Sequence, residues 1–199
     1  EKTGANILEV SRAVGLDHRI GTKFLAPSVG FGGSCFQKDI LNLVYISKSY
    51  GLDEVAEYWH QVIKMNNYQR KRFAEMIQAS LKDELTNKKI AILGWSFKKN
   101  TNDTRESSSI YVAEHLLKKG AFLNIYDPKV KSSKILNDIT LHLKSFDYSE
   151  KDIREFVKRI NVFEDILSAS HNTDAISILT EWDEFKEFNW QNLLEIADY

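Results

Sequence analysis

The sequence predicts an α/β protein in which an all-helical region precedes a doubly wound parallel sheet. Two patterns support this prediction. From Asp53 to Leu85, apolar residues recur at helical spacing without a glycine or a proline. From Lys89 onwards, short apolar runs alternate with helical patterns, which is typical of a parallel sheet. The spacing of the apolar residues changes from helical to strand-like at Lys88. We therefore place a domain boundary near Thr86, between residues 1–86 and 87–199.

The first region is predicted to hold three helices. Residues 6–14 form a short helix, and residues 22–33 form a loop with one proline and three glycines. Residues 36–50 form a second helix with apolar residues on one face, and the pattern over 53–85 predicts a long third helix. The tyrosine, tryptophan and methionine side chains of this third helix fit either ordinary core packing or contact with a second copy of the chain.

The second region is predicted to alternate strands and helices. The strands are expected at 89–94, 121–126, 161–163 and 174–180, and the helices at 107–119, 153–160 and 166–170. The first strand leads into Gly94-Trp95-Ser96-Phe97-Lys98-Lys99, which does not carry the dinucleotide fingerprint G-x-G-x-x-G. An aromatic ring and lysines at the carboxyl end of a strand suit a nucleotide other than NAD, although a solvated loop would look the same.

Composition excludes several classes of function. The chain has 27 Lys and Arg against 28 Asp and Glu, so no basic excess indicates a nucleic-acid partner or a membrane surface. No apolar run approaches the length of a membrane-spanning helix. A single cysteine excludes an internal disulfide and suits a reducing compartment, so we expect a cytoplasmic protein. We assign no metal ligands.

The stretch GFGGSCFQKD, residues 30–39, holds the residues best suited to chemistry. Its glycines allow the backbone to approach a bound group closely or to take left-handed angles. Cys35 comes just before the second helix, where the helix dipole and free N–H groups favour a thiolate. Lys38 and Asp39 add a cation and a carboxylate within the first turn. A lone cysteine is commonly a small buried hydrophobe, and the residues alone leave open both this role and that of a nucleophile.

Several motifs are similar to those of one known family. They are SVGFGGSCFQKD at 28–39, KIAILG at 89–94, FKK at 97–99, DTRESSSIY at 103–111, YDPKV at 126–130 and TEWD at 180–183. On these motifs, the chain resembles the UDP-glucose/GDP-mannose dehydrogenase family over nearly its whole length. It departs from the family pattern at Asn100 and Asn102, where Asp and Gly are expected, and at Ala26-Pro27, where a Lys-Ala pair is expected.

The resemblance implies a protein of three parts. An N-terminal NAD-binding domain would be followed by a central helical dimerisation region and a C-terminal UDP-sugar-binding domain with a Rossmann-like sheet. Residues 1–86 would be the central region and residues 87–199 the C-terminal domain. Both ends of the chain look cut from something larger, so the NAD-binding domain and the last strand would be absent. Residues 189–197 read as a final amphipathic helix.

The reaction implied by the resemblance is the oxidation of UDP-glucose to UDP-glucuronate by NAD, through a covalent intermediate on a cysteine. Cys35 would be the nucleophile, and Asp39 would assist water or proton transfer. Lys38 and Arg105 would bind the cofactor NAD. UDP-glucose would contact Arg19 of a partner subunit, together with Phe24, Ala26, Pro27, Ser28, Val29, Gly30, Phe31, Gly32, Phe97 and Lys98.

Two other functions remain open on the sequence. The substrate could be another nucleotide sugar, a UDP-N-acetyl sugar or GDP-mannose, although the cysteine motif argues for UDP-glucose. Because the dinucleotide fingerprint is missing, these 199 residues could alternatively act as a UDP-sugar-binding and dimerisation module without catalysis. The expected partners are therefore UDP-glucose and a second copy of the chain, with no nucleic acid and no membrane.

Overall fold

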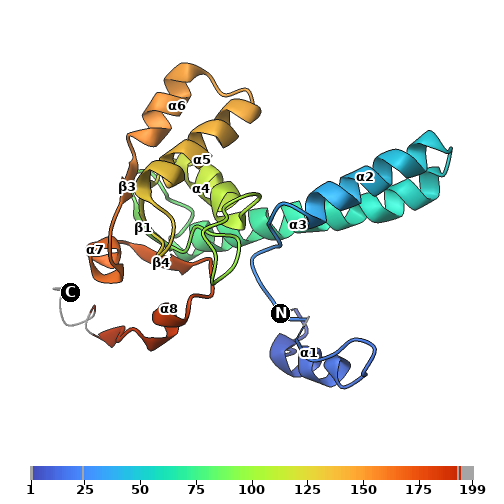
Figure 1. Cartoon of the computed structure of the whole chain (residues 1–199). Coiled ribbons are helices and arrows are strands. Elements are labelled where there is room, and N and C mark those ends of the chain that lie inside the picture. Colours follow the sequence, from blue (N-terminus) through green and yellow to red (C-terminus); the bar gives the residue numbers. More distant parts are fainter. Residues whose placement is uncertain (1, 24, 192, 194–199) are drawn as a thin grey trace.

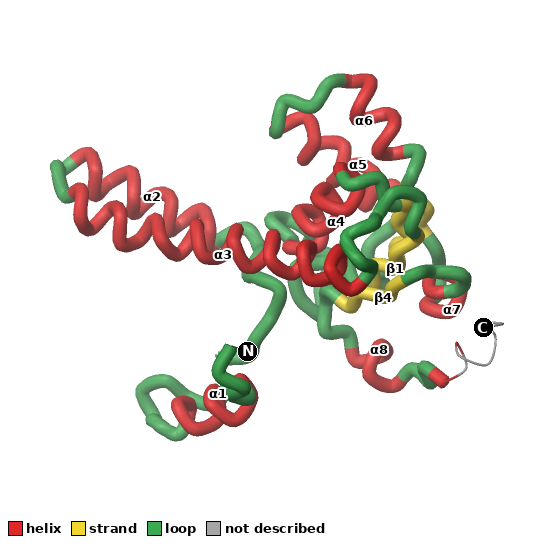
Figure 2. The backbone as a smooth tube through the Cα atoms, turned by 180° about the vertical axis from the view of Figure 1, so that it is seen from behind, coloured by secondary structure: helices red, strands yellow, loops and turns green. Residues whose placement is uncertain are grey.

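The computed structural model describes residues 2–23, 25–191 and 193 of the chain. The N-terminal part contains α1 (Ile7–Gly15), α2 (Phe36–Ser49) and α3 (Asp53–Ser80). Figure 1 shows α2 and α3 as an antiparallel hairpin that projects from the α/β body, with α1 on a separate segment. The longer helix, α3, continues past α2 and packs beside α4 of the body, as Figure 2 shows from behind.

Among the described residues, four parallel strands form one sheet in the order β3-β2-β1-β4. The strands are β1 (Lys89–Leu93), β2 (Phe122–Tyr126), β3 (Ile160–Val162) and β4 (Ala175–Ile178). The helices of this part are α4 (Ser108–Lys118), α5 (Ser132–Ser145), α6 (Glu150–Val157), α7 (Ile166–Ser170) and α8 (Asp183–Glu187). The predicted α/β class, with a parallel sheet after a helical region, is confirmed.

The order of the strands creates a switch point. From β1 the chain moves to β2 and β3 on one side of the sheet, and then returns to place β4 on the other side of β1. The order of the strands therefore reverses between β1 and β4. A crevice at the carboxyl ends of these two strands is the usual ligand site in this architecture.

Hydrophobic burial explains why β1 occupies the centre of the sheet. Its residues Ile90 to Leu93 are all fully buried, as expected for a strand covered on both faces. The hairpin has its own smaller core, in which Ile40 and Val44 of α2 pack against Ala56 and Ile63 of α3. The helix that follows the nucleophile candidate thus has a hydrophobic core separate from that of the sheet.

The structure differs from several of the predicted elements. The helix predicted at 153–160 is α6 at Glu150–Val157, and Ile160 begins strand β3. The long helix ends at Ser80 rather than Leu85, because Lys82 and Asp83 adopt positive φ angles of 57° and 62° and their N–H groups bond back to the last turn. Helices α5 and α8 were not predicted, although Ile135, Ile139 and Leu143 mark a buried helical face in α5. Most of the predicted helix at 189–197 lies outside the described residues.

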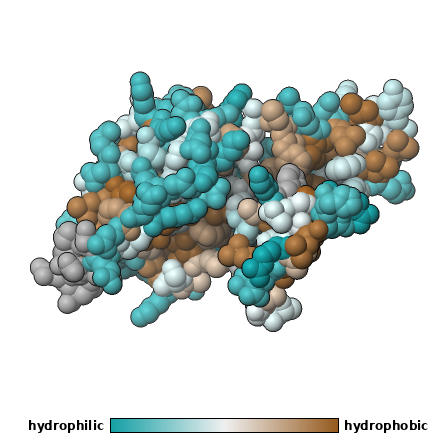
Figure 3. Space-filling model, turned by 60° about the horizontal axis from the view of Figure 1, so that its bottom comes forward, coloured by the Kyte–Doolittle hydropathy of each residue, from teal (hydrophilic) through white to brown (hydrophobic). Residues whose placement is uncertain are grey.

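The hairpin exposes many apolar side chains, which form the brown area at the right of Figure 3. On α3, Tyr58, Met65 and Tyr68 are 69%, 61% and 57% exposed, so core packing within one chain is the wrong interpretation for them. Contact with a second copy of the chain stays a prediction. None of the helices in the described ranges combines the length and apolarity that crossing a lipid bilayer requires.

Candidate active site

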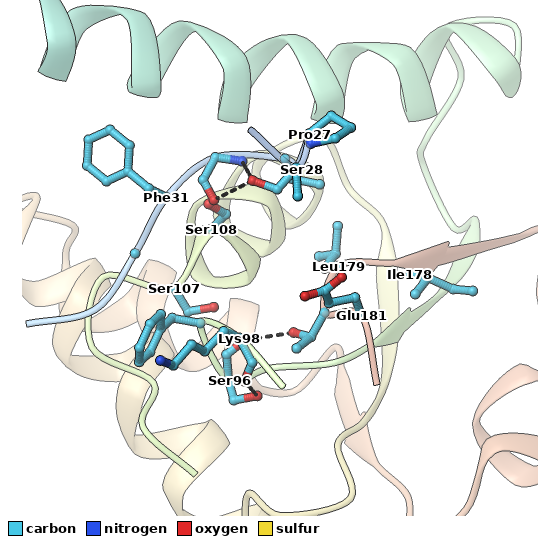
Figure 4. Close-up of a pocket in the computed structure, with 16 residues that line it drawn as sticks. Pro27, Ser28, Phe31, Ser96, Lys98, Ser107, Ser108, Ile178, Leu179 and Glu181 are labelled. Carbon is cyan, nitrogen blue, oxygen red and sulfur yellow. Dashed lines mark hydrogen bonds between the residues drawn. The ribbon is translucent and has the colours of Figure 1, made fainter. Parts of the chain in front are cut away.

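A cavity of about 400 Å³ lies at the switch point between β1 and β4. One wall is the loop 26–32, and the opposite wall consists of residues 96–98 after β1 and 178–181 at the end of β4. Figure 4 shows Pro27 and Ser28 on the first wall, below α3, and Lys98, Leu179 and Glu181 across from them. The structure therefore brings together the predicted substrate residues of the loop 26–32 and of Phe97-Lys98, from two separate parts of the chain.

Helix α3 fixes the loop wall in place. Asn66 makes two bonds to the backbone of Phe31: its Oδ1 accepts from the Phe31 N–H at 2.9 Å, and its Nδ2 donates to the Phe31 carbonyl at 3.0 Å. Arg70, one turn later, donates from Nη2 to the carbonyls of Phe31 and Glu106, both at 2.7 Å. Because Glu106 belongs to the α/β body, these bonds join the loop, the long helix and the body.

Two glycines allow the loop to lie this close to the body. A Cβ atom on Gly32 would lie 2.5 Å from the carbonyl oxygen of Glu106 and 2.9 Å from the Cβ of Phe97. Gly33 has a φ angle of 89°, and a Cβ there would lie 3.0 Å from the Phe97 ring. The sequence predicted that the backbone at the glycines approaches another group closely. At Gly32 and Gly33 these groups belong to the protein itself.

A second cavity has a volume of about 640 Å³, and the first residue of its lining, Gly33, follows the loop wall of the first cavity in the sequence. It is lined by Gly33, Ser34, Gln37, Lys38, Leu41, Arg105 and Glu106. The two predicted cofactor residues, Lys38 and Arg105, thus face one space. Arg105 binds both carboxylate oxygens of Asp103, through Nε at 3.0 Å and Nη2 at 2.7 Å. These hydrogen bonds hold the pKa of Asp103 below its usual range and fix the guanidinium at the cavity.

Cys35 is the N-cap residue of α2. It lines neither cavity itself, but Ser34 before it and Gln37 after it line the second one. It is exposed, and its side chain makes no capping bond, so the interpretation as a buried hydrophobe is wrong. The hydroxyl of Ser34 lies 3.6 Å from the sulfur. Asp39, which donates its N–H to the Cys35 carbonyl at 2.8 Å, follows one helical turn later, and its carboxylate lies 3.3 Å from Lys38 Nζ. The predicted nucleophile, cation and carboxylate share the first turn of one helix.

The structure places the predicted residue Arg19 away from this group. Arg19 is exposed in the loop after α1, where its Nη2 lies 2.6 Å from Asp17 Oδ2, and it lines neither of the two cavities. Its predicted contact with a sugar in a partner subunit stays a prediction. Phe24, also predicted to contact the substrate, falls outside the described residues.

Sequence reasoning missed several residues of the site. Those that line the first cavity are Ser96, Ser107, Ser108, Ile178, Leu179, Thr180 and Glu181. The two that hold its loop, Asn66 and Arg70, had a detectable signal. They are polar residues inside the buried face of α3, which runs from Ile63 to Ile77, and a buried polar side chain needs a partner.

Comparison with known proteins identifies the same two parts. A model of the UDP-binding domain of the UDP-glucose/GDP-mannose dehydrogenase family matches residues 91–198, and a model of the family's central domain matches residues 1–68. The chain is 52% identical over 193 residues to a UDP-glucose 6-dehydrogenase of Caenorhabditis elegans, covering 97% of this chain and 38% of that protein. It is 52% identical over 198 residues to UDP-glucose 6-dehydrogenase 3 of Arabidopsis thaliana, covering 98% and 41%.

A solved structure shares the fold. The UDP-glucose dehydrogenase of the hyperthermophilic archaeon Pyrobaculum islandicum matches 96% of this chain with a TM-score of 0.75 and 27% sequence identity, and the match covers 39% of that protein. The chain thus spans about two fifths of the length of these relatives.

Proposed function

The chain belongs to the UDP-glucose/GDP-mannose dehydrogenase family, and from this membership we propose that it is part of an enzyme that oxidises UDP-glucose to UDP-glucuronate with NAD⁺. One observation carries the proposal. The cavity at the switch point is lined by the loop 26–32 and by Phe97 and Lys98, and this loop leads directly into Cys35. A nucleotide-sugar pocket and a nucleophile would then share a single loop.

The first cavity would hold UDP-glucose. The exposed Lys98, whose Nζ lies 5.3 Å from the centre of the Phe97 ring, would attract the diphosphate. Ser107 and Ser108 line the same cavity at the N-terminus of α4, where free backbone N–H groups also favour phosphate. The loop 26–32, held by Asn66 and Arg70, would then contact the sugar and present its C6 atom toward Cys35.

The second cavity would hold the cofactor, because Lys38 and Arg105 line one space where their charged groups would bind the diphosphate of a dinucleotide. When bound, NAD⁺ accepts one hydride in each of the two oxidation steps. The remaining residues of the cofactor site would come from the N-terminal domain of the full-length protein.

The boundary between the helical region and the C-terminal domain of this chain is proposed between residues 86 and 87.

Cys35 would provide the covalent step. In the first oxidation the C6 carbon loses a hydride to NAD⁺ and its hydroxyl loses a proton, which gives an aldehyde. The Cys35 thiolate adds to the aldehyde carbon to form a C–S bond and, with a proton on the oxygen, a thiohemiacetal. Loss of the second hydride from this carbon to another NAD⁺, and of the hydroxyl proton, gives a thioester. Water then attacks the thioester carbon, the C–S bond breaks, the Cys35 thiolate is released and the carboxylate leaves. Asp39, on the first turn after Cys35, would accept the proton of the attacking water.

A second copy of the chain is the proposed partner of the hairpin. The exposed apolar side chains of α2 and α3 would be covered in a homodimer, and Arg19 would reach the sugar bound by the other subunit. This proposal predicts a dimer in sedimentation equilibrium of the full-length protein. A monomer at micromolar concentration would contradict it. The cytoplasm is the proposed compartment, because a lone exposed cysteine must remain reduced to act.

A panel of nucleotide sugars tests the substrate. The full-length protein with NAD⁺ is expected to show its highest kcat/KM with UDP-glucose, measured as NADH absorbance, against UDP-N-acetylglucosamine, UDP-N-acetylmannosamine and GDP-mannose. A higher kcat/KM with one of the others would favour the alternative nucleotide-sugar dehydrogenase. The 199-residue chain alone is expected to give no NADH with any of them, as proposed for a binding and dimerisation module without catalysis.

A further inference from the structure

Glu106, which lines the second cavity, contacts side chains of three helices, α2, α3 and α4. It lies in the turn before α4, and its Oε2 accepts hydrogen bonds from Gln37 Nε2 of α2 at 2.8 Å and from the Tyr111 hydroxyl of α4 at 2.5 Å. The same oxygen lies 3.8 Å from Arg70 Nη1 of α3. One carboxylate thus contacts the helix of the nucleophile, the helix that holds the substrate loop, and the α/β body.

The charge of Glu106 is required by its surroundings. The side chain of Arg70 is only 2% exposed, and this burial lowers its pKa. Its Nη1 is buried and has no hydrogen-bond partner among the described residues, so the nearby carboxylate is the group that compensates its charge. The guanidinium also stacks 4.0 Å above the centre of the Tyr111 ring. Burial, as the main cause, and the contact with Glu106 together raise the pKa of Tyr111 to about 12. The hydroxyl therefore remains a hydrogen-bond donor at neutral pH.

Gln37 carries this connection to the nucleophile. It lies two residues after Cys35, in the first turn of α2, and its Nε2 is bound to Glu106. Its other amide atom, Oε1, is buried without a hydrogen-bond partner in the described part of the chain. Cys35 makes no side-chain bond that would cap α2, so the link from Gln37 to Glu106 ties the first turn of this helix to the α/β body.

We infer that Glu106 is a positioning residue, which holds Cys35 at a fixed place beside the second cavity through Gln37. The inference rests on the proposed function, because it assigns the nucleophile that Glu106 positions. Glu106 acts by geometry: when the link is cut, the first turn of α2 moves relative to the cavity that holds the sugar, and the sulfur is misplaced from the C6 carbon. A misplacement of about 1 Å at a reacting centre can cost about 100-fold in rate.

The substitution Gln37→Met in the full-length protein tests this inference. It removes only the bond to α2 and leaves Glu106 in contact with Arg70 and Tyr111, while methionine favours the helix as well as glutamine does. We expect kcat with UDP-glucose to fall by about 10- to 100-fold, with KM for UDP-glucose and for NAD⁺ within about twofold of wild type. Glu106→Gln keeps an acceptor for Gln37 but leaves the buried Arg70 without its counter-charge, so we expect it to lower the Tm more than Gln37→Met does. Glu155→Gln on α6, an exposed carboxylate paired with Lys158, is the matched control.

A second measurement does not depend on the reaction. Hydrogen exchange of the backbone amides of residues 39–42, the first ones of α2 with an acceptor in the helix, is expected to be faster in Gln37→Met than in wild type, because the first turn loses its tie to the body. An unchanged kcat and unchanged exchange would overturn the inference, and so would a raised KM for NAD⁺ at constant kcat, which would make these residues cofactor contacts instead. If wild-type protein does not oxidise UDP-glucose while the exchange still differs, the proposed function fails and the link to α2 stands.

Discussion

Replacing Cys35 with alanine in the full-length protein is expected to lower the rate of UDP-glucuronate formation by at least about 10³-fold. Without the sulfur, the aldehyde formed in the first oxidation has no nucleophile to convert it to a thioester. The reaction would then stop after the first hydride transfer, so at most one NADH would form for each UDP-glucose consumed. Absorbance and product analysis measure both quantities.

The same substitution should leave binding and folding intact. Cys35 is exposed and makes no side-chain cap, so the Kd for UDP-glucose and the Tm should match those of wild type. Ser49→Ala, at the other end of α2, is the control and should retain full activity. Continued release of two NADH per UDP-glucose from the Cys35→Ala variant would remove Cys35 from the mechanism.

Replacing Gly32 with alanine is expected to raise the Kd for UDP-glucose by at least about 10-fold, equivalent to about 1.4 kcal/mol. The new methyl group would lie 2.5 Å from a backbone oxygen, that of Glu106, which cannot rotate away as a side chain can. The loop must therefore move out of the cavity or the contact between loop and body must open. Overpacking of this kind costs about 1–3 kcal/mol in the free energy of unfolding. Calorimetric titration and chemical denaturation measure the two effects.

Gly51→Ala separates this clash from a general effect of losing a glycine. Gly51 has a φ angle of 71°, but nothing lies within 4 Å of the position of a Cβ there. Its replacement is expected to cost about 1 kcal/mol of stability through backbone strain, with an unchanged Kd for UDP-glucose. Equal Kd values for the Gly32→Ala variant and wild type would show that the loop 26–32 does not line the substrate cavity in solution.

The sequence predicted only in part that the loop 26–32 and residues 96–98 line the same cavity. Lys98 and Phe97 follow a buried strand that ends in glycine, and the carboxyl end of such a strand is a known place for ligands. The loop 26–32 has no strand before it, so periodicity says nothing of where it lies. Its assignment to the substrate comes from the resemblance alone. The structure shows what holds the loop beside the cavity, namely the bonds from Asn66 and Arg70 to the backbone of Phe31.

Other parts of the site depend on tertiary contacts that a linear pattern does not contain. Asn66 belongs to the apolar stripe of α3 by its spacing, and only the approach of Phe31 shows what its amide binds. Glu181 lines the cavity because β4 lies beside β1, an order of strands that no local signal fixes. The end of α3 at Ser80 was missed because positive φ angles at Lys82 and Asp83 replace the usual glycine.

The most direct test of the central claim is the number of NADH molecules that the full-length protein forms for each UDP-glucose. We predict two, with UDP-glucuronate as the product, because a four-electron oxidation through a Cys35 thioester requires two hydride transfers. The measurement needs purified protein, limiting UDP-glucose and excess NAD⁺, with absorbance followed to completion. No NADH at all would contradict the assignment of UDP-glucose as substrate, and one NADH per sugar would contradict the thioester mechanism.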